Sequence, residues 1–251
     1  PLFGLKEDIT FFLCNKLEFL DMPGEWYYDV ATKTVYLWTK NGDSPANYVV
    51  KGSTDDYGFN IRKNDHIAIK DFDIQQFGQT AINTSYCNYI NISDNNIQDA
   101  GGRGIYSELG TYYTISNNNI NGTNQEAISI RAANSVVEEN NISDVSVFEE
   151  LGLTGAGLGM GISVNGDNTK VRYNRIQNIG YSGISITGQN LIIEYNYIDN
   201  ICTTLIDGGG IYSYTGSDVT KPGIAGTVIR NNIITNGTGS GKSYGSDKNG
   251  C

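Results

Sequence analysis

Asp207 is the residue of this 251-residue sequence that is best placed for chemistry, because three glycines follow it directly. Glycines let a backbone or a ligand approach closely, and a carboxylate beside them can act as an acid or a base. The alternative is an Asx turn, in which the Asp side chain accepts a hydrogen bond from the turn itself. We take Asp207 as the first candidate catalytic residue.

Glu149 and Glu150 are the candidate catalytic partners of Asp207. A glycoside hydrolase needs a second carboxylate, at roughly 5 Å for retention or roughly 6.5–9.5 Å for inversion. The irregular segments that hold the glutamates and Asp207 interrupt the same turn of a repeat, so they should project from one edge as a cleft wall. An acidic pair in a loop can also be merely solvated. Glu126 and Asp218 are further candidates.

A polysaccharide lyase would instead need a base such as Lys or Arg, often together with calcium held by carboxylates. Arg103, Arg131 and Lys221 are available, but no Asp cluster with calcium-ligand spacing occurs in the sequence. His66, the only histidine, is expected on the surface far from Asp207, which argues against Ser/His catalysis and His-ligated zinc. We expect no metal site and no cofactor, with calcium only if the protein is a lyase.

These residues lie on a repeat in which two apolar residues stand five positions apart. The steps between the second members of successive pairs are 23, 23, 22, 34, 22 and 35 residues. Short β-branched strands separated by Gly and Asn turns at this period favour three strands per coil, with coils stacked about 4.8 Å apart. The pairs are Ile69/Ile74, Ile92/Ile97, Ile115/Ile120, Val137/Ile142, Val171/Ile176, Ile193/Ile198 and Val228/Ile233.

A second motif, a small residue followed by Ile, comes after each of the first six pairs. It occurs at Ala81-Ile82, Gly104-Ile105, Ala127-Ile128, Gly161-Ile162, Gly183-Ile184 and Gly210-Ile211. Strand parity turns the first and third residues after each Ile outward. These positions form two columns: Asn83, Tyr106, Ser129, Ser163, Ser185 and Tyr212, then Ser85, Glu108, Arg131, Asn165, Thr187 and Tyr214.

This outward face has the composition of a glycan-binding surface. Tyr rings can stack on sugars, while hydroxyls, amides and charged groups supply hydrogen bonds. The candidate substrate-binding residues are Tyr106, Glu108, Arg131, Tyr212, Tyr214 and Lys221. The alternative is an ordinary solvated sheet in which Glu108 and Arg131 form a cross-strand ion pair.

An asparagine column stands two residues before the second apolar position of most coils. Asn tolerates left-handed turn geometry, and its amide can bond to the amides above and below, so we expect an internal ladder. Cys87 and Cys202 fall five coils apart, roughly 24 Å, and cannot form a disulfide. The predicted ladder is Asn95, Asn118, Asn140, Asn174, Asn196 and Asn231.

The N-terminal segment has a different pattern, with alternating aromatic residues around a turn at 30–33. It predicts a β-hairpin that caps the exposed end of the first coil, with sugar stacking as the alternative role. The expected fold is therefore all-β, a right-handed parallel β-helix of about seven coils with an N-terminal hairpin cap. We place the capping segment at 1–60 and the β-helix at 61–251, with a truncated C-terminus.

Composition narrows the partners. Twenty-seven acidic residues against 17 basic ones make nucleic acid an unlikely partner class on charge grounds, and no stretch is long and apolar enough to span a membrane. A polysaccharide or oligosaccharide is the expected ligand, and the oligomeric state is left open. Export would suit such a protein, although no signal sequence opens the chain.

The chain resembles the right-handed β-helix proteins of the pectate-lyase-like superfamily, many of them secreted by polysaccharide-degrading bacteria. The resemblance is carried by the coil signature from about Asp65 onward, by the segment Asp207–Tyr212, and by the hairpin segments 23–29 and 34–38. It implies a secreted or cell-surface polysaccharide-acting enzyme, with hydrolase favoured over lyase. The alternative is a non-catalytic adhesin or structural glycan-binding module, because the superfamily hosts both.

Overall fold

The computed structural model describes residues 15–148, 159–205, 207–213 and 223–237. The chain divides into two compact units, Pro1–Gly52 and Ser53–Cys251. In the described residues the first strand of the larger unit is β3 (Tyr57–Arg62), a few residues before the predicted start of the β-helix at 61. None of the described helices is long and apolar enough to cross a membrane.

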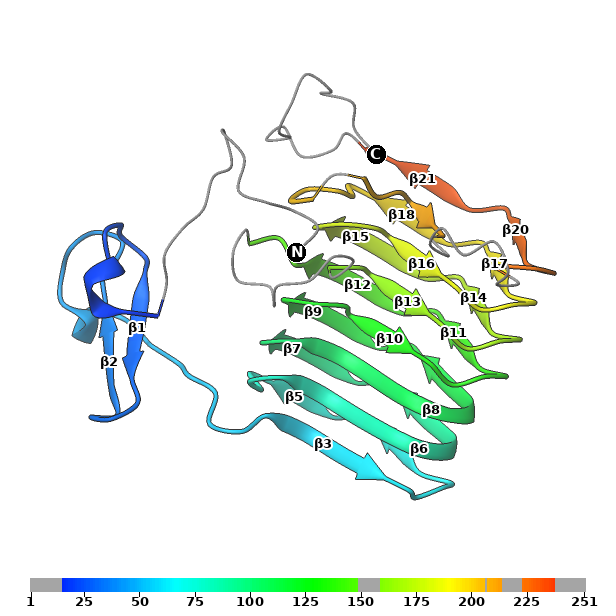
Figure 1. The fold of residues 1–251 in the computed structure, drawn as a ribbon, viewed down its shortest axis with the longest axis horizontal. Coiled ribbons are helices and arrows are strands. Elements are labelled where there is room, and N and C mark those ends of the chain that lie inside the picture. The colour runs from blue at the N-terminus through cyan, green and yellow to red at the C-terminus, as the bar shows by residue number, and fades with distance from the viewer. Residues whose placement is uncertain (1–14, 149–158, 206, 214–222, 238–251) are drawn as a thin grey trace, which may run out of the picture. The chain divides into compact units, whose positions relative to one another are not determined.

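The smaller unit contains the predicted hairpin. Its described elements are the 3₁₀ helices η1 (Leu17–Phe19) and η2 (Pro45–Asn47) and the strands β1 (Trp26–Asp29) and β2 (Thr34–Leu37). The two strands pair antiparallel across the 30–33 turn (Figure 1), which confirms the hairpin. The Asp29 carboxylate stabilises the turn by accepting hydrogen bonds from the Ala31 and Thr32 backbone N–H groups. Its role as a cap stays a prediction.

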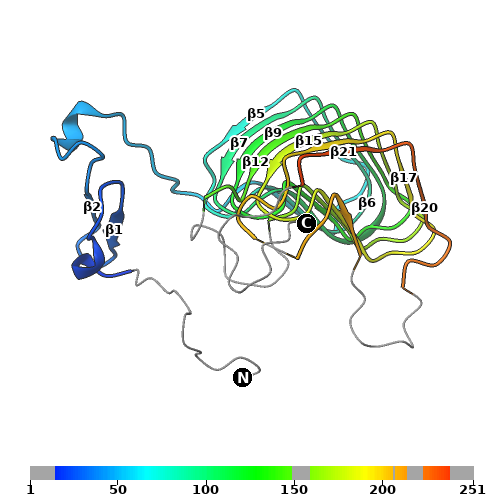
Figure 2. The same ribbon diagram turned by 90° about the horizontal axis from the view of Figure 1, so that it is seen from above.

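The larger unit is a parallel β-solenoid with three faces (Figures 1 and 2). The first face consists of β3, the start of β6 (Thr80–Ser93) and of β8 (Arg103–Ser116), β10 (Ile128–Ile130), β13 (Ile162–Val164), β16 (Ile184–Ile186) and β19 (Ile211–Tyr212). The second face consists of β4 (Ala68–Lys70), the ends of β6 and β8, β11 (Val136–Glu138), β14 (Lys170–Arg172), β17 (Ile192–Glu194) and β20 (Val228–Arg230). The third face consists of β5 (Asp73–Gln75), β7 (Asn96–Ala100), β9 (Asn119–Thr123), β12 (Asn141–Val145), β15 (Arg175–Ile179), β18 (Tyr197–Asp199) and β21 (Ile233–Thr235).

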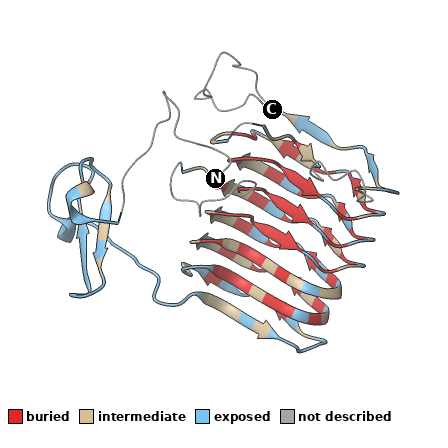
Figure 3. Cartoon of the chain, in the orientation of Figure 1, coloured by how far each residue is buried: buried red, intermediate tan, exposed pale blue. Residues whose placement is uncertain are grey.

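The apolar pairs form the core, as predicted. Ile92 pairs with Ile115 on the second face, and Ile97 pairs with Ile120 on the third. These side chains are fully buried, and Figure 3 shows the buried residues running through the stacked coils. The residue before each Ile of the first face is small because a larger side chain would collide with the core. At Gly183 a Cβ would come within 2.5 Å of the Ile198 Cγ2 atom.

The last described coil corrects the predicted register by one residue. Ile193 pairs with Ile229 and Ile198 with Ile234, so the seventh apolar pair is Ile229/Ile234 rather than Val228/Ile233. Each of these positions lies in a run of adjacent β-branched residues, and sequence alternation alone does not choose between neighbours.

The internal asparagine ladder is confirmed, with one correction. Each ladder amide donates to the Oδ1 atom of the next, at 2.9–3.0 Å, and the last acceptor is Asn232 rather than Asn231. The left-handed conformation belongs to the residue before each ladder position, so Asn231, at φ 55°, is the turn residue. Cys87 is buried and unpaired, in agreement with the prediction that it does not bridge to Cys202.

Candidate functional site

The outward column of the first face begins at Asn83, as predicted, and continues as a run of serines with a tyrosine at each end. The registry runs from Tyr106 through Ser129, Ser163 and Ser185 to Tyr212, which confirms the predicted alignment. We call the three serines the serine strip. Their side chains are small, and all three serines are buried, with 4–8% of each residue exposed, so the strip offers only a small accessible area between the two tyrosines.

Two arginine guanidinium groups lie close to the Tyr106 ring. The Arg103 guanidinium lies 4.8 Å from the ring centroid and that of Arg131 lies 5.8 Å away, both within cation–π range. Arg131 is therefore placed against Tyr106, and it is not within ion-pair distance of Glu108, its expected cross-strand partner. Sequence reasoning counted Arg103 only as a candidate lyase base, because it lies before the small-Ile motif rather than after it.

Glu126 lies beside this end, but its carboxylate is already bound. Arg103 donates from Nε to Glu126 Oε2 at 2.8 Å, and only 8% of the Glu126 side chain is exposed. A buried charge with one strong partner contributes to structure and is not open to a ligand. Glu126 is therefore a poor candidate for the second catalytic carboxylate.

Asp207 lies near the other end of the column, in contact with the buried Tyr181. Its backbone carbonyl accepts a hydrogen bond from the Tyr181 hydroxyl at 2.6 Å, and the Tyr181 ring lies 6.0 Å from that of Tyr212. Burial, with the nearby Tyr212 and Asp207, raises the pKa of Tyr181 to about 12, so its hydroxyl remains a donor at neutral pH. The predicted residues Asp207 and Tyr212 are therefore brought together through Tyr181, which sequence reasoning missed.

The carboxylate of Asp207 is exposed and accepts no hydrogen bond within the described residues. The backbone N–H that an Asx turn would use, that of Gly209, donates instead to Ser182 Oγ at 3.4 Å. Gly208 is required sterically, because a Cβ there would come within 2.9 Å of the Tyr181 ring and 2.8 Å of the Cys202 sulfur. The glycines hold Asp207 close to the tyrosine with its side chain open to solvent.

Four predicted site residues, Glu149, Glu150, Tyr214 and Lys221, lie outside the described residues, as does Asp218. His66 is exposed, as predicted, and stacks on Tyr89 with ring centroids 4.7 Å apart. The described residues contain no group of three or more metal-ligating side chains.

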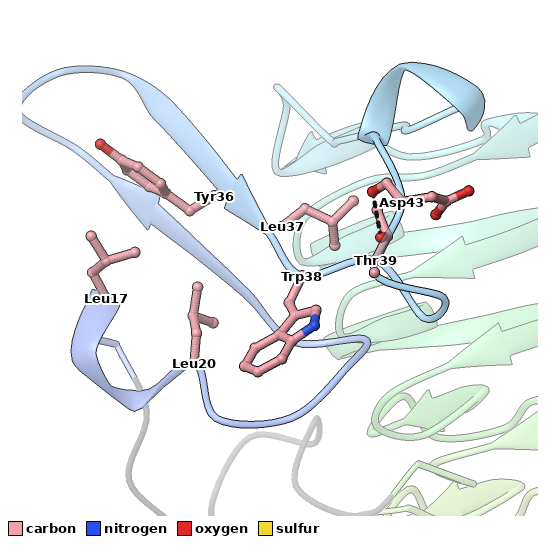
Figure 4. A pocket seen from close by; sticks show the side chains of 8 residues that line it. Leu17, Leu20, Tyr36, Leu37, Trp38, Thr39 and Asp43 are labelled. Carbon is pink, nitrogen blue, oxygen red and sulfur yellow. Dashed lines mark hydrogen bonds between the residues drawn. The ribbon is translucent and has the colours of Figure 1, made fainter.

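The smaller unit has a pocket of its own, of about 350 Å³. Figure 4 shows Leu17 and Leu20, from η1 and the residue after it, together with Tyr36, Leu37 and Trp38 from β2 and its end. Thr39 and Asp43 also line the pocket, and the Thr39 hydroxyl donates to the Asp43 carbonyl at 2.7 Å. The lining is mostly apolar and offers few directed polar groups, so the first face is the stronger candidate site.

Comparison with known families gives one match, to the family described as "Right handed beta helix region", over residues 45–166 and 80–251. The two matched segments overlap and together reach from the end of the smaller unit through the whole solenoid. No curated protein matches the chain.

Proposed function

Because this chain belongs to the right-handed β-helix family, we propose that it is a secreted polysaccharide-acting enzyme that binds its substrate across the first face of the solenoid. The observation that carries the proposal is the column in which Tyr106 and Tyr212 stand at the two ends of the serine strip. Family membership supports a carbohydrate-acting or surface role in general, and this column supports a glycan as the ligand.

The column has the dimensions of a polymer site. Tyr106 and Tyr212 are separated by four strand steps of about 4.8 Å, roughly 19 Å, which is long enough for several sugar units laid across the coils. The half-buried rings of Tyr106 and Tyr212 supply apolar surface. The serine hydroxyls between them can donate and accept hydrogen bonds, but only over the 4–8% of each serine that is exposed. Arg131, which stacks on Tyr106, adds a donor that recognises ring or substituent oxygens.

Asp207 is the proposed catalytic acid or base. Its carboxylate is exposed beside the Tyr212 end of the column and is not engaged by another described residue. We assign hydrolysis ahead of elimination, because a carboxylate is the group at this end. Glu149 and Glu150 are the proposed second carboxylate, as an inverting or retaining hydrolase requires two.

The test is a panel of polysaccharides assayed in parallel for new reducing ends and for the ultraviolet absorbance of unsaturated products. Reducing ends without absorbance are expected, and Asp207→Asn should lower the rate by at least about 100-fold, as loss of a general acid or base does. Asp71→Asn is the matched control, because Asp71 is also exposed with a left-handed backbone, at φ 62° against 66° for Asp207.

Ultraviolet absorbance that depends on Asp207 would show that the protein is a lyase rather than a hydrolase. Absence of turnover on every polysaccharide, with binding that Tyr106→Ala weakens, would replace the enzyme with a non-catalytic glycan-binding module. Absence of both turnover and binding would contradict the proposal as a whole.

A further inference from the structure

A pocket of about 470 Å³ lies at the turn that follows the third face, and its lining includes none of the residues of the outward column. Its lining comes from the ends of β7, β9 and β12 and from Val147 and Phe148, at the start of the irregular segment after β12. This is the edge on which the sequence predicts a cleft wall. The residues that form the pocket, however, are not among the predicted site residues.

Three lining side chains present unused binding groups to this pocket. The Asp99 carboxylate and the Asn124 amide make no side-chain hydrogen bond within the described part of the chain. The Phe148 ring is 64% exposed, although it lies in a concave site. A free acceptor, a group that both donates and accepts, and an open aromatic ring therefore converge on one space.

A second carboxylate in the lining, that of Asp144, is held in place rather than free. Asn121 donates from Nδ2 to Asp144 Oδ2 at 2.6 Å, and the Asn178 amide donates to the other carboxylate oxygen. Because both oxygens already face N–H donors, Asp144 is poorly suited to a cation and well suited to carry fixed negative charge at the pocket wall.

Gly122 makes room for the Asp99 carboxylate at the pocket wall. Its φ is +72°, and a Cβ at this position would come within 2.8 Å of Asp99 Oδ1. The neighbouring coils place Asp99 and Asp144 at the same corner position as Gly122. Because both Asp144 oxygens already accept hydrogen bonds, the Asp99 carboxylate is the acceptor at this corner that remains available to a ligand.

We propose that this pocket binds one neutral sugar unit. The Phe148 ring stacks on the C–H face of the sugar, the Asp99 carboxylate accepts from hydroxyl groups, and the Asn124 amide donates and accepts. The carboxylates of Asp99 and Asp144 repel anionic sugars, and the described lining residues include no Lys or Arg. The volume lies within the usual range of small-ligand pockets, about 300–1,000 Å³.

The experiment is ligand-observed saturation-transfer NMR on the full chain with glucose, galactose and mannose, and with glucuronic and galacturonic acid as anionic comparators. At least one neutral sugar should bind, and both acids should bind more weakly. Phe148→Ala and Asp99→Asn should each weaken that binding by about 10-fold. The matched control is Tyr86→Ala, because Tyr86 is also an exposed aromatic residue, 45% accessible, at a different corner.

The outcomes separate this site from the first face. The monosaccharide signal should depend on Phe148 more strongly than on Tyr106, whereas polysaccharide binding should depend on Tyr106. If Tyr106→Ala abolishes the signal and Phe148→Ala does not, the sugar binds on the first face and the pocket proposal is wrong. Preferred binding of the acids, or no signal from any of the five sugars, would equally overturn it.

Discussion

Two rows of asparagine amides run along the solenoid, one inside and one outside, and they come from the same dipeptides. In Asn95-Asn96, Asn118-Asn119 and Asn140-Asn141 the first residue belongs to the internal ladder and the second points outward from the third face. The amide-to-amide distances are nearly identical, 2.9 Å inside and 2.8–2.9 Å outside.

The rows differ in what surrounds them. Asn118 and Asn140 are 1% exposed, whereas Asn119 and Asn141 are exposed. Each internal amide also donates to a main-chain carbonyl of another coil, as Asn140 does to the Ile115 oxygen at 3.0 Å. Water can replace a lost outer bond but not an inner one. Equal geometry therefore does not imply an equal contribution to stability.

The largest expected effect is the loss of an internal amide. Asn140→Ala removes the acceptor of the Asn118 side-chain amide and the donor to the Asn174 side-chain oxygen. It should therefore lower the free energy of unfolding by about 3 kcal/mol. Asn141→Ala should lower it by less than about 0.5 kcal/mol, because its groups become solvated. Urea unfolding followed by circular dichroism measures both, and equal losses would show that burial does not distinguish the rows.

A smaller effect should appear in the coupling between neighbours. A double-mutant cycle on Asn118 and Asn140 should give an interaction free energy of about 1 kcal/mol, since the two amides share a bond in a dry interior. The same cycle on Asn119 and Asn141, which share a bond of 2.8 Å, should give a value close to zero. A large coupling outside would mean that the outer row is shielded from water in solution.

The sequence predicts the inner row well and the outer row poorly, for a physical reason. Isoleucines at a fixed spacing place the core, and the core places the ladder, because both are buried in every coil. The single error, Asn231 for Asn232, falls where two asparagines and two isoleucines are adjacent, so a one-residue shift leaves the pattern intact.

The candidate sites likewise divide into residues that the sequence could place and residues that it could not. The alignment of Tyr106 with Tyr212 could be predicted, because both positions are set by the buried isoleucine before them. The roles of Tyr181 and Asp99 could not be. Asp99 lies at the end of β7, beside the buried Ala100, and Tyr181 lies in the turn that follows β15, where coil lengths vary. Contacts made at such a turn depend on the backbone path, which residue spacing does not encode.

The smallest expected effect concerns Asp199, a charged member of the outer surface of the third face. Hydrogen bonds from the Thr235 hydroxyl, at 2.8 Å, and the Asn236 amide, at 2.6 Å, lower the pKa of this carboxyl below its ordinary value of 3.8. A carboxyl whose pKa is lower in the folded state stabilises the fold above its unfolded pKa and loses that contribution as the pH falls through the folded pKa.

The wild type should therefore lose slightly more stability than Asp199→Asn below about pH 4, with no difference in pH dependence between pH 6 and pH 8. Urea midpoints of both proteins across this range measure the effect, and parallel curves down to pH 2 would show that even a charged outer bond is exchanged for water without cost.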